Sequence, residues 1–207
     1  MVRRNIMGLL VCSLTVGLVS MAFAGIPDLE QSSATTIATQ QVSMYNLPNG
    51  GGDPFTDVYV QGGGKTDATV TVTLLDSAMQ PIFNYPFEDI WVVSNNPVMV
   101  ICPGGSSSDA NTDASGQTTF TGAMFAGADG LGLVVVVNGD ALTQAPLNFK
   151  FNSPDMSGDL VVNLTDVINF TGVYYGAYDY SADFYWDLTI NLSDIVLLAQ
   201  GLGSECP

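Results

Sequence analysis

The chain has 207 residues, of which 20 are acidic and 4 are basic, so that its formal net charge at pH 7 is −16. Such a charge repels phosphate groups and argues against nucleic acids and anionic lipids as partners. Because 47% of the residues are apolar, the composition also excludes a disordered acidic chain.

The first 24 residues have the pattern of a secretion signal. Arg3 and Arg4 provide a positive start, an apolar run follows from Ile6 to Val19, and Ala22-Phe23-Ala24 is a small-x-small cleavage site. We expect cleavage after Ala24 and a mature protein that is secreted or held at the cell surface, without insertion in the membrane. A retained membrane anchor is the alternative, although the apolar run is short for a span.

Residues 25–150 carry the signals of short strands. Val70, Val72 and Leu74 alternate with threonines, which is the period-two pattern of a half-buried strand. Turn-forming pairs such as Asn49-Gly50 recur at short intervals, and no segment has helical periodicity. Further strands are predicted at residues 55–60, 90–93, 98–101, 118–121, 131–137 and 147–151, after a strand or extended lead-in within 25–41. This succession predicts a mainly β protein whose two sheets form a β-sandwich.

Two segments of this region resemble a known family. Thr69–Pro81 (TVTVTLLDSAMQP) and Thr112–Phe120 (TDASGQTTF) are similar to the strand-and-turn segments of bacterial immunoglobulin-like domains of secreted and surface proteins. The resemblance implies an immunoglobulin-like β-sandwich over residues 25–150. It also implies a spacer or a binding platform rather than an enzyme.

The tail of the chain contains an internal repeat. Asp155–Asp166 (DMSGDLVVNLTD) and Asp183–Asp194 (DFYWDLTINLSD) begin 28 residues apart and share Asp at places one, five and twelve, Leu at six and ten, and Asn at nine. A twelve-residue loop with oxygen ligands at such places is how a chain wraps calcium. A single chance cluster of acids would not repeat in this way. The sequence therefore predicts two calcium ions.

The ligands fall at equivalent places of the two loops. They are Asp155, Ser157, Asp159, the carbonyl of Val161, Asn163 directly or through water, and Asp166 in the first loop, and Asp183, Asp187, the carbonyl of Thr189, Asn191 and Asp194 in the second. Place three of the second loop is Tyr185, whose hydroxyl is too remote, so we expect weaker binding or a water ligand there. Place six is Leu160 or Leu188, for which the usual left-handed backbone costs about 1 kcal/mol or more. Gly158 is an alternative pivot in the first loop.

A helix is predicted after each loop, over residues 164–175 and 192–202, because apolar residues recur there at helical spacing. Thr165 and Ser193 stand near the two helix starts, where a hydroxyl can cap free backbone amides. Each unit is thus one loop followed by one helix.

Two such units resemble a type I dockerin, the calcium-dependent module that binds cohesin domains, and the resemblance covers residues 151–207. It implies that calcium orders the helices and that one helical face docks on a cohesin-type partner. By the same resemblance, places ten and eleven contribute to partner choice; here they are Leu164-Thr165 and Leu192-Ser193. The alternative is a structural surface or matrix protein in which the calcium sites only stabilise the fold.

Cys102 and Cys206 remain once the signal, which contains Cys12, is removed. Outside the cytoplasm an even pair suggests a disulfide, which would tie the tail to the larger domain. Two free thiols are the alternative, because the sequence does not give the separation of the two residues.

Three further patterns have simple structural interpretations. Asp109, Asn111 and Asp113 have the spacing of calcium ligands, but no acid completes a loop, and a turn is the better interpretation. Glu88-Asp89 beside Trp91 suggests sugar chemistry, but neighbours on a strand point to opposite faces. A cluster of aromatic residues that links the two repeats is interpreted as core; its members are Tyr174, Tyr175, Tyr178, Tyr180, Phe184, Tyr185 and Trp186.

The composition also argues against an enzyme. The chain contains no histidine, which removes the usual general base, the Ser-His triads and the His zinc sites. Beyond the signal only Lys65 and Lys150 are basic, which leaves little to hold a phosphate or carboxylate substrate. Carbohydrate recognition by the sandwich remains a further, non-enzymatic alternative.

Overall fold

Two β-sheets enclose one hydrophobic core in the computed structural model, which describes residues 25–207. The smaller sheet is antiparallel, with the order β1-β5-β8. Its strands are β1 (Ser33–Thr36), β5 (Val70–Thr73) and β8 (Gln117–Phe120). Val70 and Val72 are buried and the threonines that follow each of them are half-buried, which matches the alternation in the sequence.

The larger sheet has the order β11-β10-β12-β2-β3-β4, and β6 also pairs with β10. Its strands are β2 (Val42–Tyr45), β3 (Val58–Val60), β4 (Gly64–Thr66), β6 (Ile90–Ser94), β10 (Gly130–Val137), β11 (Asp140–Ala141) and β12 (Leu147–Asn152). β12 and β2 run parallel, whereas the other pairs are antiparallel. A short separate pair joins β7 (Val100–Ile101) to β9 (Ala126–Gly127).

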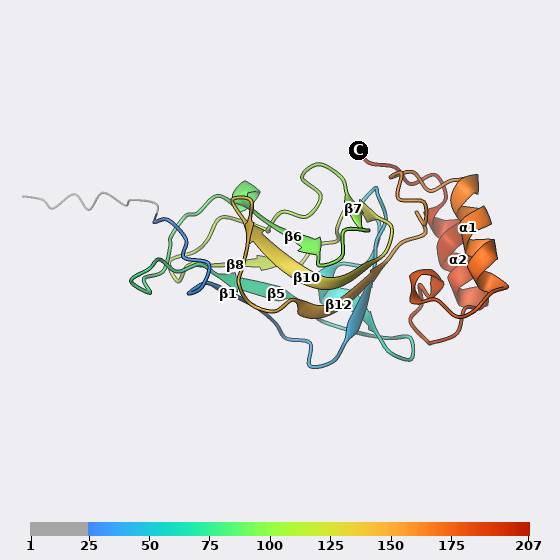
Figure 1. Ribbon diagram of the computed structural model, residues 1–207, viewed down its shortest axis with the longest axis horizontal. Coiled ribbons are helices and arrows are strands. Elements are labelled where there is room, and N and C mark those ends of the chain that lie inside the picture. The colour runs from blue at the N-terminus through green and yellow to red at the C-terminus, as the bar shows by residue number, and fades with distance from the viewer. Residues whose placement is uncertain (1–24) are drawn as a thin grey trace, which may run out of the picture.

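Inward-facing residues of both sheets meet in the core between them. The ring of Phe149 on β12 lies 5.7 Å from that of Phe55 and 5.9 Å from that of Phe151, measured between centroids. Each such fully buried side chain contributes about 1.5–3 kcal/mol to folding. The prediction of a mainly β fold with packed sheets is confirmed, and Figure 1 shows the sheets on one side of two helices.

The strand predicted at residues 55–60 begins as a 3-10 turn, and a second 3-10 turn precedes the strand predicted at residues 90–93. Residues 55–57 form η1 (Phe55–Asp57) ahead of β3, and η2 (Phe87–Asp89) precedes β6. Each turn follows a proline, Pro54 or Pro86, whose fixed φ suits the start of a helical turn. The premise that Glu88 and Asp89 alternate across a strand is therefore wrong, since both lie in η2.

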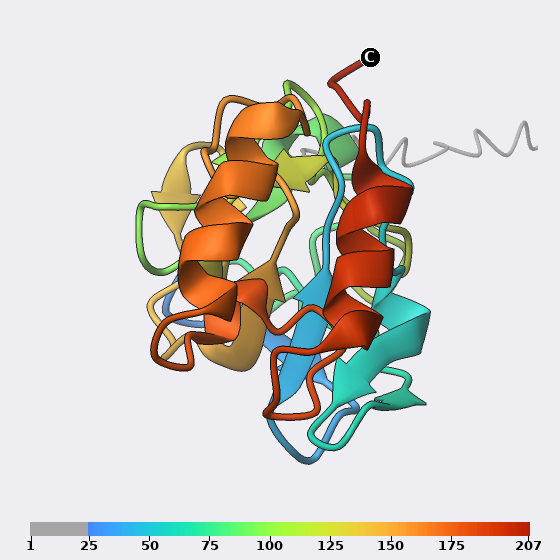
Figure 2. The ribbon, with the colours of Figure 1, turned by 90° about the vertical axis from the view of Figure 1, so that its right-hand side faces the viewer.

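The tail contains the helices α1 (Leu164–Tyr174) and α2 (Leu192–Gly201), with the 3-10 turn η3 (Tyr180–Ala182) between them. Figure 2 shows α1 and α2 side by side at the end of the sandwich. Within residues 25–207, no helix has the length and apolar character needed to cross a membrane. The predicted signal and its cleavage site lie outside the described residues.

The helix caps are asparagines rather than the predicted hydroxyl residues. Asn163 accepts a hydrogen bond from the backbone N–H of Thr165, and Asn191 accepts one from Ser193, at 2.8 Å in both cases. Thr165 and Ser193 therefore lie inside the first turns and do not cap them. Each asparagine forms a reciprocal capping box with the Asp three residues later. Thr165 and Ser193 stand two residues after the caps and cannot form this box.

A second hydrophobic cluster joins the tail to the sandwich. Tyr45 and Tyr59 of the larger sheet pack with Phe184 and Trp186, and the rings of Tyr45 and Phe184 lie 5.9 Å apart. The Tyr45 hydroxyl donates to the carbonyl of Leu197 in α2 at 2.8 Å. The predicted boundary after residue 150 falls inside β12, so the sheet passes into the first loop without a flexible linker.

Cys102 and Cys206 form a disulfide across this same end of the molecule, with their Cα atoms 5.8 Å apart. Cys102 follows β7, and Cys206 is the next-to-last residue of the chain. The bond therefore fixes the C-terminus to a loop of the sandwich, 104 residues away in sequence.

Candidate metal centre

The first loop is organised around two buried carboxylates. Asp155 accepts hydrogen bonds from the backbone N–H groups of Gly158 and Leu160, both at 2.9 Å. Asp166 accepts from Ser157 and Asn163, both at 2.8 Å. These bonds draw the two ends of the loop together and fix the orientation of both carboxylates.

Both loops have the same unusual backbone. At place six Leu160 and Leu188 have φ of 66° and 67°, so the left-handed conformation expected there is present in spite of its cost to leucine. Place four is also left-handed, in Gly158 (71°) and in Trp186 (56°). The repeat thus extends from sequence to main-chain geometry, including a position where one loop has glycine and the other tryptophan.

Three carboxylates of the first loop converge. Asp155, Asp159 and Asp166 each offer an oxygen, and these oxygens lie within 4.8 Å of one another. Two oxygens on opposite sides of a calcium ion stand about 5 Å apart, because calcium–oxygen distances are about 2.4 Å. Asp155 and Asp166 are fully buried and Asp159 is exposed, which leaves one open side toward solvent. These residues fit a hard divalent cation.

The electrostatics of the first loop favour a cation as well. Burial raises the pKa of Asp155, backbone hydrogen bonds partly oppose that rise, and the charges of Asp166 and Asp159 increase it. Neither lysine of the described residues neutralises this cluster. Lys65 pairs with Asp53 at 2.6 Å and Asp57 at 3.3 Å. The amine of Lys150 lies over aromatic rings of the tail.

The remaining predicted ligands of the first loop contribute to different extents. The Ser157 hydroxyl lies 3.3 Å from Asp155 and so belongs to the cluster. The side-chain oxygen of Asn163 is engaged as the helix cap, and its amide donates to the carbonyl of Val161 at 3.1 Å. Asn163 is therefore placed to contact a cation through water, as is common at place nine.

The second loop repeats this hydrogen bonding but differs at its carboxylates. Asp183 accepts from the N–H of Leu188 and Asp194 accepts from that of Asn191, both at 2.8 Å. However, the hydroxyl of Tyr178 also donates to Asp183 at 2.8 Å, and the Asn191 amide donates to Asp187 at 3.1 Å. Neither of these two contacts has a counterpart in the first loop, where the Asn163 amide donates to the carbonyl of Val161.

Among the described residues, three carboxylates converge in the first loop, and no corresponding group of three converges in the second. Burial raises the pKa values of Asp183 and Asp194. Thr189 provides its carbonyl to the Asn191 amide at 3.1 Å. The two predicted ion sites are therefore not equivalent, and the contribution of Tyr178 could not be anticipated, because that residue precedes the loop.

The predicted partner-contact residues stand at the surface of the tail. Leu164 and Leu192 are 71% and 69% exposed, and Thr165 and Ser193 follow them at the helix starts. Between the helices runs an apolar groove lined by Val167, Phe170, Thr171, Tyr174, Tyr175, Ile195 and Leu198. The exposed leucines occupy matching positions of the two repeats.

Two other sequence patterns have clear outcomes in the structure. Asp109 accepts from the hydroxyls of Thr119 and Thr121, whereas Asp113 accepts from backbone amides of its own turn, so these acids do not form a common site. The aromatic cluster divides: Phe184 and Trp186 are buried as predicted, but Tyr175 is 81% exposed and is not core.

Comparisons with known proteins add little to this description. No family model matches the chain, and no curated protein matches it. Among solved structures, the chain is similar to the filamin domain of Lin-41, with a TM-score of 0.32 and 12% identity over 60% of this chain and 95% of that one. The function is therefore argued from the site itself.

Proposed function

We propose that this protein is a secreted, non-enzymatic attachment or assembly protein, with an immunoglobulin-like sandwich that carries a calcium-binding tail. The observation that carries the proposal is the convergence of Asp155, Asp159 and Asp166 in a loop whose hydrogen bonding is repeated 28 residues later. Dockerin-like modules have this arrangement of paired loops and helices, and their partners are cohesin domains.

Calcium is the cation that suits this site best. All the available donors are oxygens, whereas zinc sites in proteins are rich in nitrogen and sulfur ligands. The site is open on the side of Asp159 and has irregular spacing, which suits calcium better than the strict octahedron of magnesium. The first loop is the tight site, and the second is a weaker one because Tyr178 competes for Asp183.

The docking surface is the exposed side of α1 and α2 near their first turns. Leu164 and Leu192 stand at place ten of their loops, so either repeat can present a similar apolar contact to a partner. Ile168 and Val196, one turn further along each helix, extend this surface and are 64% and 47% exposed. A cohesin-type partner would cover apolar area that the fold itself leaves open.

A purely structural protein is the second candidate, and the seam between tail and sandwich favours it. Tyr45 and Tyr59 bury against the tail, and the Cys102–Cys206 disulfide ties its end down. In that case calcium stabilises the whole fold and no partner is involved. At a calcium concentration of 100 times Kd the gain is about 2.7 kcal/mol.

The test is a calorimetric titration of calcium into the mature chain, residues 25–207, after treatment with EDTA. We expect one tight site that is lost in Asp159→Asn, a substitution at an exposed position, and retained in Asp140→Asn, which removes the same charge elsewhere. A failure of wild-type protein to bind calcium would overturn the proposal.

Pull-down with type I cohesin domains then separates the two candidates. Capture that requires calcium and is lost in the Leu164→Ser/Leu192→Ser double variant supports docking. Calcium binding with an increase in Tm, but without capture, supports the structural candidate.

A further inference from the structure

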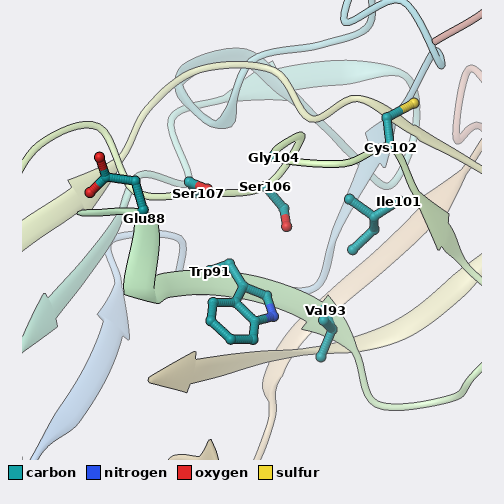
Figure 3. Close-up of a pocket in the computed structure, with 8 residues that line it drawn as sticks. All are labelled: Glu88, Trp91, Val93, Ile101, Cys102, Gly104, Ser106 and Ser107. Carbon is teal, nitrogen blue, oxygen red and sulfur yellow. The ribbon is translucent and has the colours of Figure 1, made fainter. Parts of the chain in front are cut away.

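A cleft on the sandwich is lined by residues that lie outside both loops of the tail. Its volume is about 350 Å³, within the range of small-molecule sites. The floor is β6, where Trp91 and Val93 stand on the same side of the strand because they are two residues apart. The loop after β7 lies beside β6, with an antiparallel bridge between Trp91 and Ser107, and it adds Gly104, Ser106 and Ser107 to the lining (Figure 3).

Four residues contribute polar groups to the lining of this cleft. These groups are the indole N–H of Trp91, the hydroxyls of Ser106 and Ser107, and the carboxylate of Glu88. Trp91 is half-buried and Glu88 is exposed. Figure 3 shows the Ser106 hydroxyl directed into the space between loop and strand, with Glu88 at one end of the cleft.

The lining is apolar on one side and polar around its edge. Trp91, Val93 and Ile101 provide the apolar part, and Trp91 provides a flat aromatic face. A sugar ring has the complementary character, because one face presents C–H groups and its rim presents hydroxyls. C–H groups pack favourably on the electron-rich face of an indole, and the rim hydroxyls would meet Glu88, Ser106 and Ser107.

Charge decides between the ligand classes that this lining could accept. The cleft contains no cationic side chain and one carboxylate, on a protein of net charge −16, which disfavours phosphates and acidic sugars. A quaternary ammonium group is usually held by a cage of several aromatic rings, and this cleft has only Trp91. A neutral ligand with many hydroxyls fits best.

We propose that the cleft between β6 and the loop Cys102–Ser107 binds neutral saccharides, with one pyranose ring stacked on Trp91. Glu88 and the two serine hydroxyls bind hydroxyl groups on the rim of the sugar. Backbone hydrogen bonds fix this loop on β6, because Val92 donates its N–H to the carbonyl of Ser106 at 3.1 Å and Ser108 donates its N–H to that of Ile90 at 2.9 Å. This site does not depend on calcium or on the tail surface.

The test uses the mature chain, residues 25–207, titrated by NMR with hexasaccharides of four neutral polysaccharides: cellulose, xylan, mannan and chitin. Choline and a galacturonic acid hexamer serve as cationic and acidic comparison ligands. The chain has two tryptophans, so two indole N–H signals are present, and Trp91→Phe assigns them. We expect at least one neutral hexasaccharide to shift the Trp91 signal and leave that of the buried Trp186 in place.

Affinity of the variants is then measured by calorimetry. Trp91→Ala should weaken binding at least tenfold and Glu88→Gln a few-fold, whereas Phe83→Ala, at a 59% exposed position outside the cleft, should leave it unchanged. The NMR titration of wild-type protein decides the matter even where Trp91→Ala fails to fold. Absence of any neutral-sugar shift at millimolar concentration, unchanged affinity in a folded Trp91→Ala, or stronger binding of choline or the acidic hexamer would each overturn the proposal.

Discussion

Gly127 of β9 lies directly against the carboxylate of Asp155. A Cβ atom at position 127 would overlap the side-chain oxygen of Asp155, and the next residue, Ala128, donates its N–H to the Asp155 carbonyl at 2.8 Å. Asp155 is also the first carboxylate of the proposed calcium loop, so the sandwich constrains the proposed cation site of the tail.

Gly127→Ala should therefore weaken calcium binding. The added methyl group must displace the Asp155 carboxylate from the amides of Gly158 and Leu160, and we expect at least a tenfold loss of affinity by calorimetry. Gly122→Ala is the matched control, because a Cβ there meets nothing within 4 Å. Equal affinities in the two variants would show that β9 does not constrain the site.

Leu188 stores backbone strain that can be measured separately from its packing. Its φ of 67° is disfavoured for leucine but not for glycine, and its side chain is about half exposed. Leu188→Ala and Leu188→Gly lose similar contacts, yet only the glycine relieves the strain. In urea unfolding with EDTA present, we expect the glycine variant to be more stable than the alanine variant by about 1 kcal/mol. The reverse order would contradict the left-handed assignment.

Tyr178 should control the second loop. Its hydroxyl donates to Asp183 at 2.8 Å; burial raises the pKa of Tyr178, and the hydrogen bond to Asp183 raises it further. Tyr178→Phe leaves Asp183 without that donor, so the metal-free protein should lose about 1–3 kcal/mol of stability while the second calcium site tightens. Tyr175→Phe, at an exposed position, is the control. If calorimetry shows the same number of bound calcium ions in both variants, Tyr178 does not control the second loop.

The buried acids predict how calcium changes the pH dependence of stability. Burial raises the pKa values of Asp155, Asp183 and Asp194 above the ordinary value of 3.8. In the window above 3.8 the folded state binds more protons than the unfolded state, so these groups lose their favourable contribution as pH rises through the folded pKa values.

The metal-free protein should consequently gain stability from these three acids as the pH falls from 7 toward that window. Calcium needs the ionised carboxylates, so the increase in Tm that it causes should be larger at pH 7 than at pH 5. Thermal unfolding at both pH values, with calcium and with EDTA, measures the difference. Asp155→Asn should make the increase in Tm caused by calcium more similar at the two pH values. If this increase is the same at pH 7 and pH 5 in the wild-type protein, calcium does not act through ionisation of these carboxylates.

Reduction of the disulfide should destabilise the fold strongly. Cys102 and Cys206 close a loop with a sequence separation of 104, for which the chain-entropy model gives about 4.7 kcal/mol. Urea unfolding with and without reductant measures the loss, and Cys206→Ser should reproduce it without reductant. If reductant also destabilised the Cys206→Ser variant, the loss of stability could not be assigned to this disulfide.

Local patterns allowed much of this fold to be predicted. The alternation of Val70 and Val72 with threonines identified β5, and the repeat placed both loops and both helices because hydrogen bonds at residues 155–166 and 183–194 are local. The contacts of Gly127 with Asp155 and of Tyr45 with Phe184 were not predictable, since they join segments far apart in sequence. Glu88 lies in a 3-10 turn and not on a strand because the chain turns directly after Pro86, a position that strand alternation does not reveal.

The tail is covalently anchored at both of its ends. Its backbone leaves the sheet through β12, and its last residues return to the sandwich through the Cys102–Cys206 bond. A pulling force on α1 or α2 is therefore carried by both connections, and the tail cannot separate from the sandwich by breaking its contacts at one end only. A protease cut between the two repeats would likewise release no fragment, because the disulfide still joins the last residues to the sandwich.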